Sequence, residues 1–481
     1  MPAETAPIPP IDRLDPGAVD QIHDASMRIL EELGIQVSHD RALEILESSG
    51  ADVDDELVTI DRTIVEEALA SAPASFMLHG RGDGTNVAVG TGEAALRAPG
   101  YGPPNLVSHG GDRRSSQLSD YEDLVKLAHE SRAINCTGYN VCEPNDVDQE
   151  VKHIEMVSRS LTLSDQPLMA STYGEERAAA CLDLVGIAVD DHELSRPYVA
   201  GLINTVPPRS LDTKMVGGLL TYAEHGQPVI VSSFTMAGAS GPATLAGSLA
   251  QANAENLLGI TLAQLVNPGT PVVYGVPSSN IDMRYGSLSI GSPESALFVS
   301  FAGQMGRYYD VPSRAGGSLS DSKTVDYQAG FESSLVMATT AFAGIDFVLH
   351  AAGILESYSA ISKEKFVLDC ELLEYLDRFS AGYELTEDAF AMDVIADVEP
   401  ADHYLNTMHS LEHAESAFLL SEIADKRSHS DWAEDGEQTA FARAADVVDE
   451  RLEDYDQPSM DTETKRQLRA AVESERERIR S

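Results

Sequence analysis

The sequence predicts an α/β protein with a (β/α)8 TIM-type barrel and helical extensions at both ends. Between residues 86 and 400, eight short apolar, β-branched runs alternate with stretches of 12 to 20 residues that have helical periodicity. Five runs begin with proline, which suits the first residue of a strand because it cannot donate to the ladder. Eight strand–helix units over about 280 residues are typical of a closed parallel barrel, and a doubly wound open sheet is the alternative.

The eight expected strands follow one another at regular spacing. They are LRAPG near residue 96, INCTGYNVCE from 134, PLMASTYG from 167, PYVAGLINTV from 197, PVIVSSFTMAG from 228, PVVYGVPSS from 271, PSRAGGSLS from 312 and FVLHAAGILE from 347. The stretches between them carry serine N-caps, acids in the first turn and glycine near the end, which are helix boundary signals.

The two segments that flank the expected barrel are predicted to be helical. Residues 1–85 form an expected helical N-terminal segment, with apolar side chains at helical spacing in 15–33, 39–49 and 62–71. Residues 401–481 form an expected helical C-terminal extension that is far more charged, as in a solvated helix with one packed face.

Charge and composition exclude several classes of protein. The 481 residues contain 78 acids and 33 bases, a net charge of −45, and the bases do not cluster, so we expect no nucleic-acid partner. This acidity suits a cytosol of high salt, with an ordinary acidic bacterial protein as the alternative. The chain has no apolar run near 18 residues and no secretory signal at its start, so we expect a cytoplasmic protein without a membrane partner. The spread of Cys136, Cys142, Cys181 and Cys370 indicates reduced thiols.

The carboxyl ends of barrel strands carry the chemistry of such folds, and here they are rich in aromatic residues. Tyr101, Tyr139, Tyr173, Phe234 and Tyr274 all fall near expected strand ends. A ring of aromatic faces can hold a quaternary ammonium, which has no N–H to donate. Tyrosines are also common at ordinary half-buried positions, and that reading stays open for each of them.

Two basic residues stand at the ends of the last strands. Arg314 follows an apolar strand, so its charge requires either a protein acid or a substrate carboxylate as its partner. His350 could face the barrel mouth as a hydrogen-bond donor or an acid–base group, or it could be a core histidine.

Other motifs are weak. His409 and His413 have a spacing compatible with a metal, but nothing completes a site, so we expect no metal. Gly316 and Gly317 resemble a barrel phosphate grip that lacks a neighbouring lysine before Lys323. Dinucleotide, P-loop and GxSxG motifs are absent.

Longer segments carry a resemblance to a known family. MAGASGPATLAGSLAQANAENL (236–257), NIDMRYGSLSIGSPE (280–294), GGSLSDSKTVDYQAGFES (316–333) and HAAGILES (350–357) closely resemble the trimethylamine methyltransferase superfamily, as do the N-terminal IHDASMRILEELGIQVSHDRALEILESSGADVD and the HYLNTMHSLEH stretch. Pyrrolysine, which the founding members insert, does not occur in the sequence, so the chain resembles the non-pyrrolysine branch.

The resemblance implies a function and a set of site residues. It implies a barrel enzyme that moves a methyl group from a methylated amine, with glycine betaine the typical donor, to the cobalt of a corrinoid. The corrinoid is carried by a separate protein, so no tightly bound cofactor is expected, and a homo-oligomer is. Arg314 and His350 would then act as the catalytic pair that holds a betaine carboxylate, and Tyr101, Tyr139, Tyr173, Phe234 and Tyr274 would form the cation cage. Glu143 or Glu356 would add a counter-charge to the ammonium or pair with Arg314. The alternatives are trimethylamine as the methyl donor and a non-catalytic relative that binds a quaternary amine osmolyte.

Overall fold

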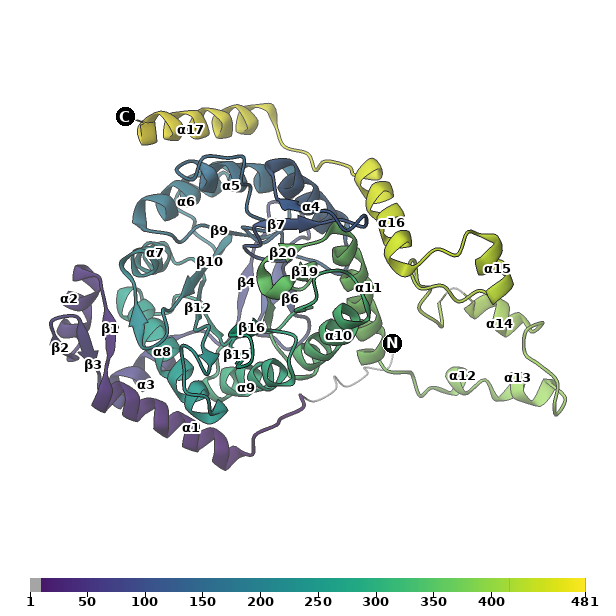
Figure 1. Ribbon diagram of the computed structural model, residues 1–481, viewed down its shortest axis with the longest axis horizontal. Coiled ribbons are helices and arrows are strands. Elements are labelled where there is room, and N and C mark those ends of the chain that lie inside the picture. Colours follow the sequence, from purple (N-terminus) through teal and green to yellow (C-terminus); the bar gives the residue numbers. More distant parts are fainter. Residues whose placement is uncertain (1–9, 415, 481) are drawn as a thin grey trace.

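A computed structural model describes residues 10–414 and 416–480 of the chain. Its centre is a sheet of seven parallel strands in the order β6-β18-β17-β14-β12-β10-β9, enclosed by a ring of helices (Figure 1). These strands are β6 (Leu96–Arg97), β9 (Leu168–Ala170), β10 (Val199–Asn204), β12 (Val229–Ser232), β14 (Val272–Gly275), β17 (Ser313–Arg314) and β18 (Phe347–Val348). All residues of β9, β12 and β14 are buried, as expected for parallel strands that are covered on both faces.

The expected closure by an eighth regular strand is wrong. Residues 134–139, which the sequence predicts to lie between β6 and β9, have no strand conformation. Their backbone still bonds on both sides, since Cys136 N–H donates to Arg97 O at 3.2 Å and Thr137 N–H donates to Pro167 O at 3.0 Å. Gly138, which adopts a positive φ of 70°, interrupts the run, and its carbonyl accepts from Met169 N–H. The eighth position is therefore filled by irregular backbone.

One helix follows each of the eight positions. They are α4 (Leu118–Glu130), α5 (Lys152–Leu163), α6 (Glu175–Val189), α7 (Thr213–Glu224), α8 (Leu245–Val266), α9 (Pro293–Tyr309), α10 (Tyr327–Phe342) and α11 (Lys363–Ser380). Side-chain N-caps at Asp212, Ser292, Asp326 and Ser362 start four of them. Each cap oxygen accepts an otherwise unpaired first-turn amide, which explains why the helices begin at these residues.

The N-terminal segment contains short strands as well as helices. Its helices are α1 (Pro16–Arg28), a π-helical turn η1 (Ile29–Leu33), α2 (Asp40–Ser48) and α3 (Arg62–Ser71). Strands β1 (Ile35–Val37), β2 (Asp52–Asp54) and β3 (Leu57–Thr59) form a small sheet with β11 (Ser210–Leu211), and β4 (Phe76–Leu78) pairs with β5 (Val87–Val89). Because α1 and α3 pack on α8, this segment supports one side of the barrel (Figure 1).

Two small sheets of short strands lie at the carboxyl ends of the barrel strands. β7 (Asn105–Val107) and β8 (Arg113–Ser115) join β19 (Ile354–Leu355) and β20 (Ala360–Ile361) in one sheet. A second sheet contains β13 (Met236–Ala237), β15 (Ser279–Asp282) and β16 (Ser287–Ser289). A 3-10 turn, η2 (Glu356–Tyr358), links β19 to β20.

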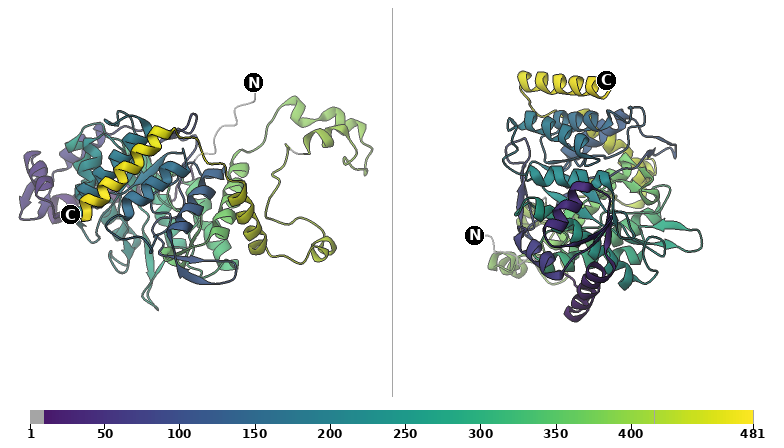
Figure 2. Two further views of the ribbon diagram at one scale, coloured as in Figure 1. Left: turned by 90° about the horizontal axis from the view of Figure 1, so that it is seen from above. Right: turned by 90° about the vertical axis from the view of Figure 1, so that its left-hand side faces the viewer.

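The C-terminal part first leaves the barrel and then returns to it. Short helices α12 (Glu387–Phe390), α13 (Met392–Asp397), α14 (Met408–His413) and α15 (His429–Glu434) project outward (Figure 2). Helix α16 (Ala440–Asp454) then packs on α11, and α17 (Thr462–Arg480) lies across α5 and α6. Among the described residues, no helix is both long and apolar enough to span a membrane. All four cysteines are buried and unpaired.

Candidate functional site

Arg314 is a buried cation at the end of β17 with almost no protein partner. Its strand pairs with β14 and β18, and the residue is 2% exposed. One guanidinium N–H donates to Ser232 Oγ at 3.1 Å, and the buried Nε has no acceptor. No carboxylate within the described ranges forms an ion pair with it. Burial lowers the pKa of Arg314 to about 10, so the guanidinium remains protonated at neutral pH. It can therefore donate further hydrogen bonds to a ligand.

His350 stands beside Arg314, directly after β18. The Tyr101 backbone N–H donates to His350 Nδ1 at 3.1 Å, so the ring proton of the neutral imidazole belongs on Nε2. Burial and, after it, the charge of Arg314 hold the pKa of His350 well below its usual value. His350 is therefore a neutral donor through Nε2–H, which has no partner among the described residues.

The backbone at His350 packs closely against the loop that follows β17. His350 has a φ of 69°, and its carbonyl accepts from Ser318 N–H at 3.0 Å. A Cβ on Gly317 would lie 2.3 Å from that carbonyl oxygen, and Gly317 itself has a φ of 120°. The glycine pair at 316–317 thus allows two loops to approach, which accounts for the motif without a phosphate.

Four aromatic side chains form a row of ring contacts with the imidazole ring of His350 at its centre. Ring centroids are 6.2 Å apart for Tyr101 and Tyr139, 4.6 Å for His350 and Tyr358, and 5.9 Å for Phe234 and Tyr358. Tyr101 stands edge-on to His350 at 6.5 Å. We refer to Tyr101, Tyr139, Phe234, His350 and Tyr358 as the aromatic cluster. Burial raises the pKa of Tyr101 and of Tyr358, and the positive charge of Arg314 opposes this rise at both residues. The cation therefore borders the cluster.

Tyr358 is the member that sequence reasoning missed. It ends the turn η2, ten residues after β18, and does not directly follow a barrel strand. Glu356, Ser357 and Tyr358 have φ values of 50°, 52° and 72°, three consecutive non-glycine residues in the left-handed region. Backbone strain of this kind concentrates at functional sites. It could not be predicted here, because the residue types at 356–358 do not favour the left-handed region.

Two of the predicted tyrosines lie elsewhere. Tyr173 is 44% exposed, with Lys214 Nζ 4.2 Å from its ring centroid. Tyr274 is fully buried, and its hydroxyl donates to Asn253 Oδ1 on α8 at 2.7 Å. Side chains alternate along β14, so Tyr274 points outward to the helices while the neighbouring Gly275 approaches Ser232. Neither ring contacts the aromatic cluster.

The two candidate acids have partners of their own. Glu356 accepts from Arg113 Nε through both carboxylate oxygens, at 3.0 and 3.1 Å. Glu143 pairs with Lys152 and also accepts from Asn140 Nδ2 at 2.9 Å. Neither acid contacts Arg314, so the protein-acid alternative for Arg314 has no support from these residues.

Glu255, a buried carboxylate on α8, forms hydrogen bonds with the strand ends next to the cluster. Glu255 accepts from Thr205 Oγ1 at 2.6 Å, Ser233 Oγ at 2.8 Å, Arg209 N–H at 2.7 Å and Gln251 Nε2 at 3.1 Å. Burial raises the pKa of Glu255, and these four bonds oppose that shift. The network joins the ends of β10 and β12, which positions Ser232 and Phe234.

The two histidines that the sequence singles out for a metal have no further ligand beside them in the described part of the chain. His409 and His413 lie in α14, with ring centroids 4.2 Å apart, and His413 Nδ1 bonds to the carbonyl of His409. Within residues 10–414 and 416–480, no three or more His, Cys, Asp or Glu side chains are grouped so that they could hold a metal ion.

Together, the fold and the site define a barrel-like α/β protein that presents a buried cation and an aromatic cluster at the carboxyl ends of its strands. Such a site matches a small ligand with one anionic end and one apolar or cationic end. The family model described as Trimethylamine methyltransferase (MTTB) matches residues 1–479. The chain belongs to the trimethylamine methyltransferase family and is a methyltransferase.

Individual relatives agree with this assignment. Glycine betaine methyltransferase of Desulfitobacterium hafniense (strain Y51) is 41% identical over 470 residues, covering 97% of each chain. Proline betaine:corrinoid methyltransferase of Eubacterium limosum is 30% identical over 461 residues, covering 94% of each. The crystal structure of monomethylamine methyltransferase from Methanosarcina barkeri has a TM-score of 0.50 at 11% identity, covering 92% of this chain and 93% of the other, and supports the TIM-like fold alone.

Proposed function

We propose that this enzyme transfers a methyl group from glycine betaine, or a closely similar carboxylated quaternary amine, to the cobalt of a corrinoid on a separate protein. The observation that carries the proposal is Arg314, a buried and protonated cation that has a single hydrogen bond and no carboxylate partner among the residues the structure describes. The names of the relatives support the same class of donor and acceptor.

In this proposal the carboxylate end of the substrate binds Arg314 and His350. The guanidinium offers parallel N–H donors that match a carboxylate in a bidentate way, and His350 adds Nε2–H. Because His350 is held neutral, its role is to donate a hydrogen bond and orient the substrate, with no proton moved. Ser232 helps to fix the guanidinium through the 3.1 Å hydrogen bond.

The trimethylammonium end then lies among Tyr101, Tyr139, Phe234 and Tyr358. Each aromatic face contributes about 0.5–2 kcal/mol to a desolvated cation. Glu143 adds a negative charge nearby, since it contributes to the raised pKa of Tyr101 after burial, the larger cause. The cage directs one N-methyl group outward at the carboxyl ends of the strands, where a partner protein can approach.

The methyl acceptor is the reduced cobalt of the partner's corrinoid, a strong nucleophile. The C–N bond breaks with its electron pair remaining on nitrogen, so the product is a neutral tertiary amine that still carries its carboxylate. No proton is needed for this departure. The chain's contribution is therefore orientation at near-attack distance, which can supply much of the barrier reduction in such displacements.

The test is methyl transfer by purified protein with its reduced corrinoid partner, with glycine betaine or trimethylamine as donor. We expect transfer from glycine betaine, and Arg314→Met to lower kcat/KM for it at least 100-fold. Transfer from trimethylamine alone, unaffected by Arg314→Met, would contradict the proposal and favour the amine without a carboxylate. Tight betaine binding without any transfer would instead identify a non-catalytic osmolyte-binding relative.

A further inference from the structure

The turn η2 places Tyr358 in the aromatic cluster although the backbone of the turn is strained. All three of its residues have left-handed φ values. Such a conformation persists in non-glycine residues only where surrounding contacts over-determine it. The loop after β17 supplies two of these contacts. Glu356 N–H donates to Ser322 O at 2.9 Å, and Ser357 N–H donates to Ser320 O at 3.2 Å. The conformation of the turn is therefore fixed from outside, by this loop.

Asp321 lies in the middle of the same loop, and its carboxylate accepts four hydrogen bonds. One comes from the turn, where Ser357 Oγ donates to Oδ1 at 2.6 Å, while Leu288 O is a more distant acceptor for the same hydroxyl at 3.2 Å. The other three donors are Ile290 N–H at 2.9 Å, Gly291 N–H at 3.1 Å and Ser289 Oγ at 3.1 Å. One side chain thus joins η2 to the segment between β16 and α9.

Asp321 is itself held in place by a buried acid on α10. Glu332 is 7% exposed, and its Oε2 accepts from Asp321 N–H and from Ser320 Oγ, both at 2.8 Å. A Cβ on Gly291 would lie only 2.5 Å from the carboxyl carbon of Glu332, so the backbone there packs tightly against this acid. The Asp321 carboxylate therefore has a defined position from which it can hold the turn.

The Tyr358 side chain depends on the turn for its position. Within the described ranges its hydroxyl has no hydrogen-bond partner, and its ring–ring contacts are those with His350 and Phe234. Burial raises the pKa of Tyr358, and the negative charge of Asp321 adds to this rise, so the carboxylate lies near the phenol. Ser357, which Asp321 holds, is the residue directly before Tyr358. A change at Asp321 is thus transmitted to the ring by one residue of backbone.

We infer that Asp321 is a positioning residue of this enzyme, which fixes the turn η2 through Ser357 and thereby keeps the Tyr358 ring in the aromatic cluster. The assignment follows from the contacts of the turn. Its consequence for the substrate rests on the proposed function, in which Tyr358 is one of the aromatic faces around the quaternary nitrogen. In that arrangement Asp321 acts through Tyr358 and not by contact with the substrate.

The first test follows the Tyr358 ring without any ligand. The protein is labelled with fluorotyrosine at its 16 tyrosines, and the fluorine NMR signal of Tyr358 is the one that disappears in Tyr358→Phe. We expect Asp321→Ala and Ser357→Ala each to shift or broaden this signal. The control, Asp212→Ala, removes a carboxylate that likewise accepts from two backbone amides, at the start of α7, and should leave the signal unchanged.

The second test measures whether the effect on binding passes through Tyr358. Asp321→Ala should weaken the binding of tetramethylammonium, measured by calorimetry, about 3- to 30-fold, the loss expected when one aromatic face leaves a desolvated cation. In a Tyr358→Ala background the same substitution should change the affinity by less than about 2-fold, because the side chain that Asp321 positions is already absent. A residue that only stabilised the fold would weaken binding equally in both backgrounds.

The two tests separate this inference from the proposed function. A Tyr358 signal that is unchanged in Asp321→Ala and in Ser357→Ala, or an equal loss of affinity in the two backgrounds, would overturn the inference. Ser357→Ala removes a single hydroxyl and gives both readouts if Asp321→Ala fails to fold. A wild type that binds no tetramethylammonium, while Asp321→Ala still displaces the Tyr358 signal, would support the assignment of Asp321 and contradict the proposed function.

Discussion

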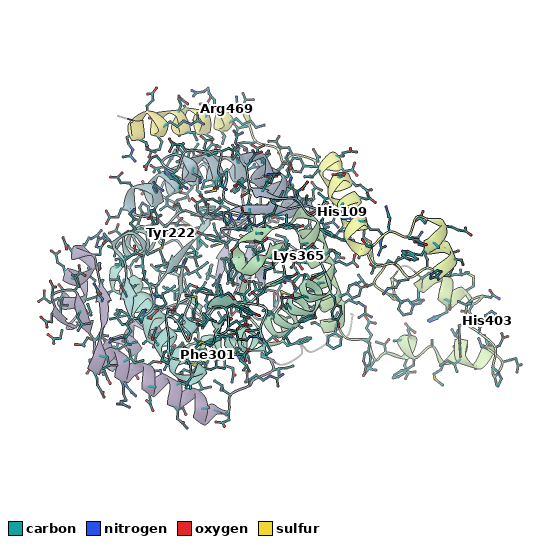
Figure 3. All side chains as sticks on the ribbon, in the orientation of Figure 1. His109, Tyr222, Phe301, Lys365, His403 and Arg469 are labelled. Carbon is teal, nitrogen blue, oxygen red and sulfur yellow. The ribbon has the colours of Figure 1, made fainter. Side chains whose placement is uncertain are left out.

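Arg314 and Lys365 are both buried cations, but they differ in how many hydrogen-bond partners surround them. Lys365, which Figure 3 labels, donates through Nζ to Asp369 at 2.7 Å, Ser333 Oγ at 2.8 Å and Ser318 O at 3.1 Å. These three bonds satisfy the ammonium completely. Within the described part of the chain, Arg314 has only Ser232 as a hydrogen-bond partner. An unpaired buried charge reduces stability, and a folded chain keeps one where a ligand supplies the counter-charge.

Replacing each cation therefore separates function from stability. We expect Arg314→Met to raise the free energy of unfolding of the free enzyme by about 1–3 kcal/mol, because an uncompensated buried charge is removed. The matched Lys365→Met should lower the free energy of unfolding by about 3–5 kcal/mol, because buried Asp369 then has no counter-charge. Thermal unfolding measures both. A melting temperature that falls in the Arg314 variant would show that Arg314 has a protein partner after all.

His350 should leave a signature in the pH dependence of stability. Burial holds its pKa well below 6.5, so the unfolded chain binds a proton below about pH 6.5 that the folded chain does not. The stabilisation from a neutral His350 is therefore complete above pH 6.5 and is lost as the pH falls. In His350→Gln we expect the free energy of unfolding to decline less steeply towards pH 5, by up to about 1.4 kcal/mol per pH unit. Chemical denaturation at a series of pH values measures this, and parallel curves for both proteins would contradict it.

At the scale of elements, the site depends on how closely the loops after β17 and β18 approach. The pattern of strand and helix was predictable, because buried parallel strands are apolar throughout and capping residues mark helix starts. The irregular eighth position was not, since INCTGYNVCE is as apolar and β-prone as its neighbours. Tyr274 was misplaced because the pattern does not show which face of a two-sided strand a residue occupies. Tyr358 was missed because it reaches the site from a strained turn.

Gly317→Ala tests this loop packing. The added Cβ would meet His350 O at 2.3 Å, and φ is 120°, so we expect a loss of about 2–4 kcal/mol in stability and a higher KM for glycine betaine. Gly330→Ala is the matched control in α10, where nothing lies within 4 Å of the new Cβ. It should raise stability by about 0.5–1 kcal/mol. Equal effects at both glycines in unfolding experiments would refute the role given to the 317 approach.

At the scale of the whole molecule, the charge of −45 opposes folding and association alike. Repulsion among exposed acids weakens as the Debye length falls from about 10 Å at 0.1 M salt to about 3 Å at 1 M. We therefore expect the melting temperature to rise by several degrees between 0.1 and 2 M NaCl. Calorimetry in NaCl, a salt without the strong exclusion effect of sulfate, measures it. A melting temperature that falls steadily with NaCl would mean that the ion pairs outweigh the repulsion.

The central claim is that Arg314 binds a substrate carboxylate while the aromatic cluster holds the quaternary nitrogen. Calorimetric titration of the wild type and Arg314→Met with glycine betaine and with tetramethylammonium, which has no carboxylate, tests both halves together. We predict that the wild type binds glycine betaine at least about 30-fold more tightly than tetramethylammonium, since a buried charge-assisted pair contributes about 2 kcal/mol or more. Arg314→Met should lose that preference while it still binds tetramethylammonium. Equal affinity for both ligands in the wild type, or a preference that persists in Arg314→Met, would contradict the claim.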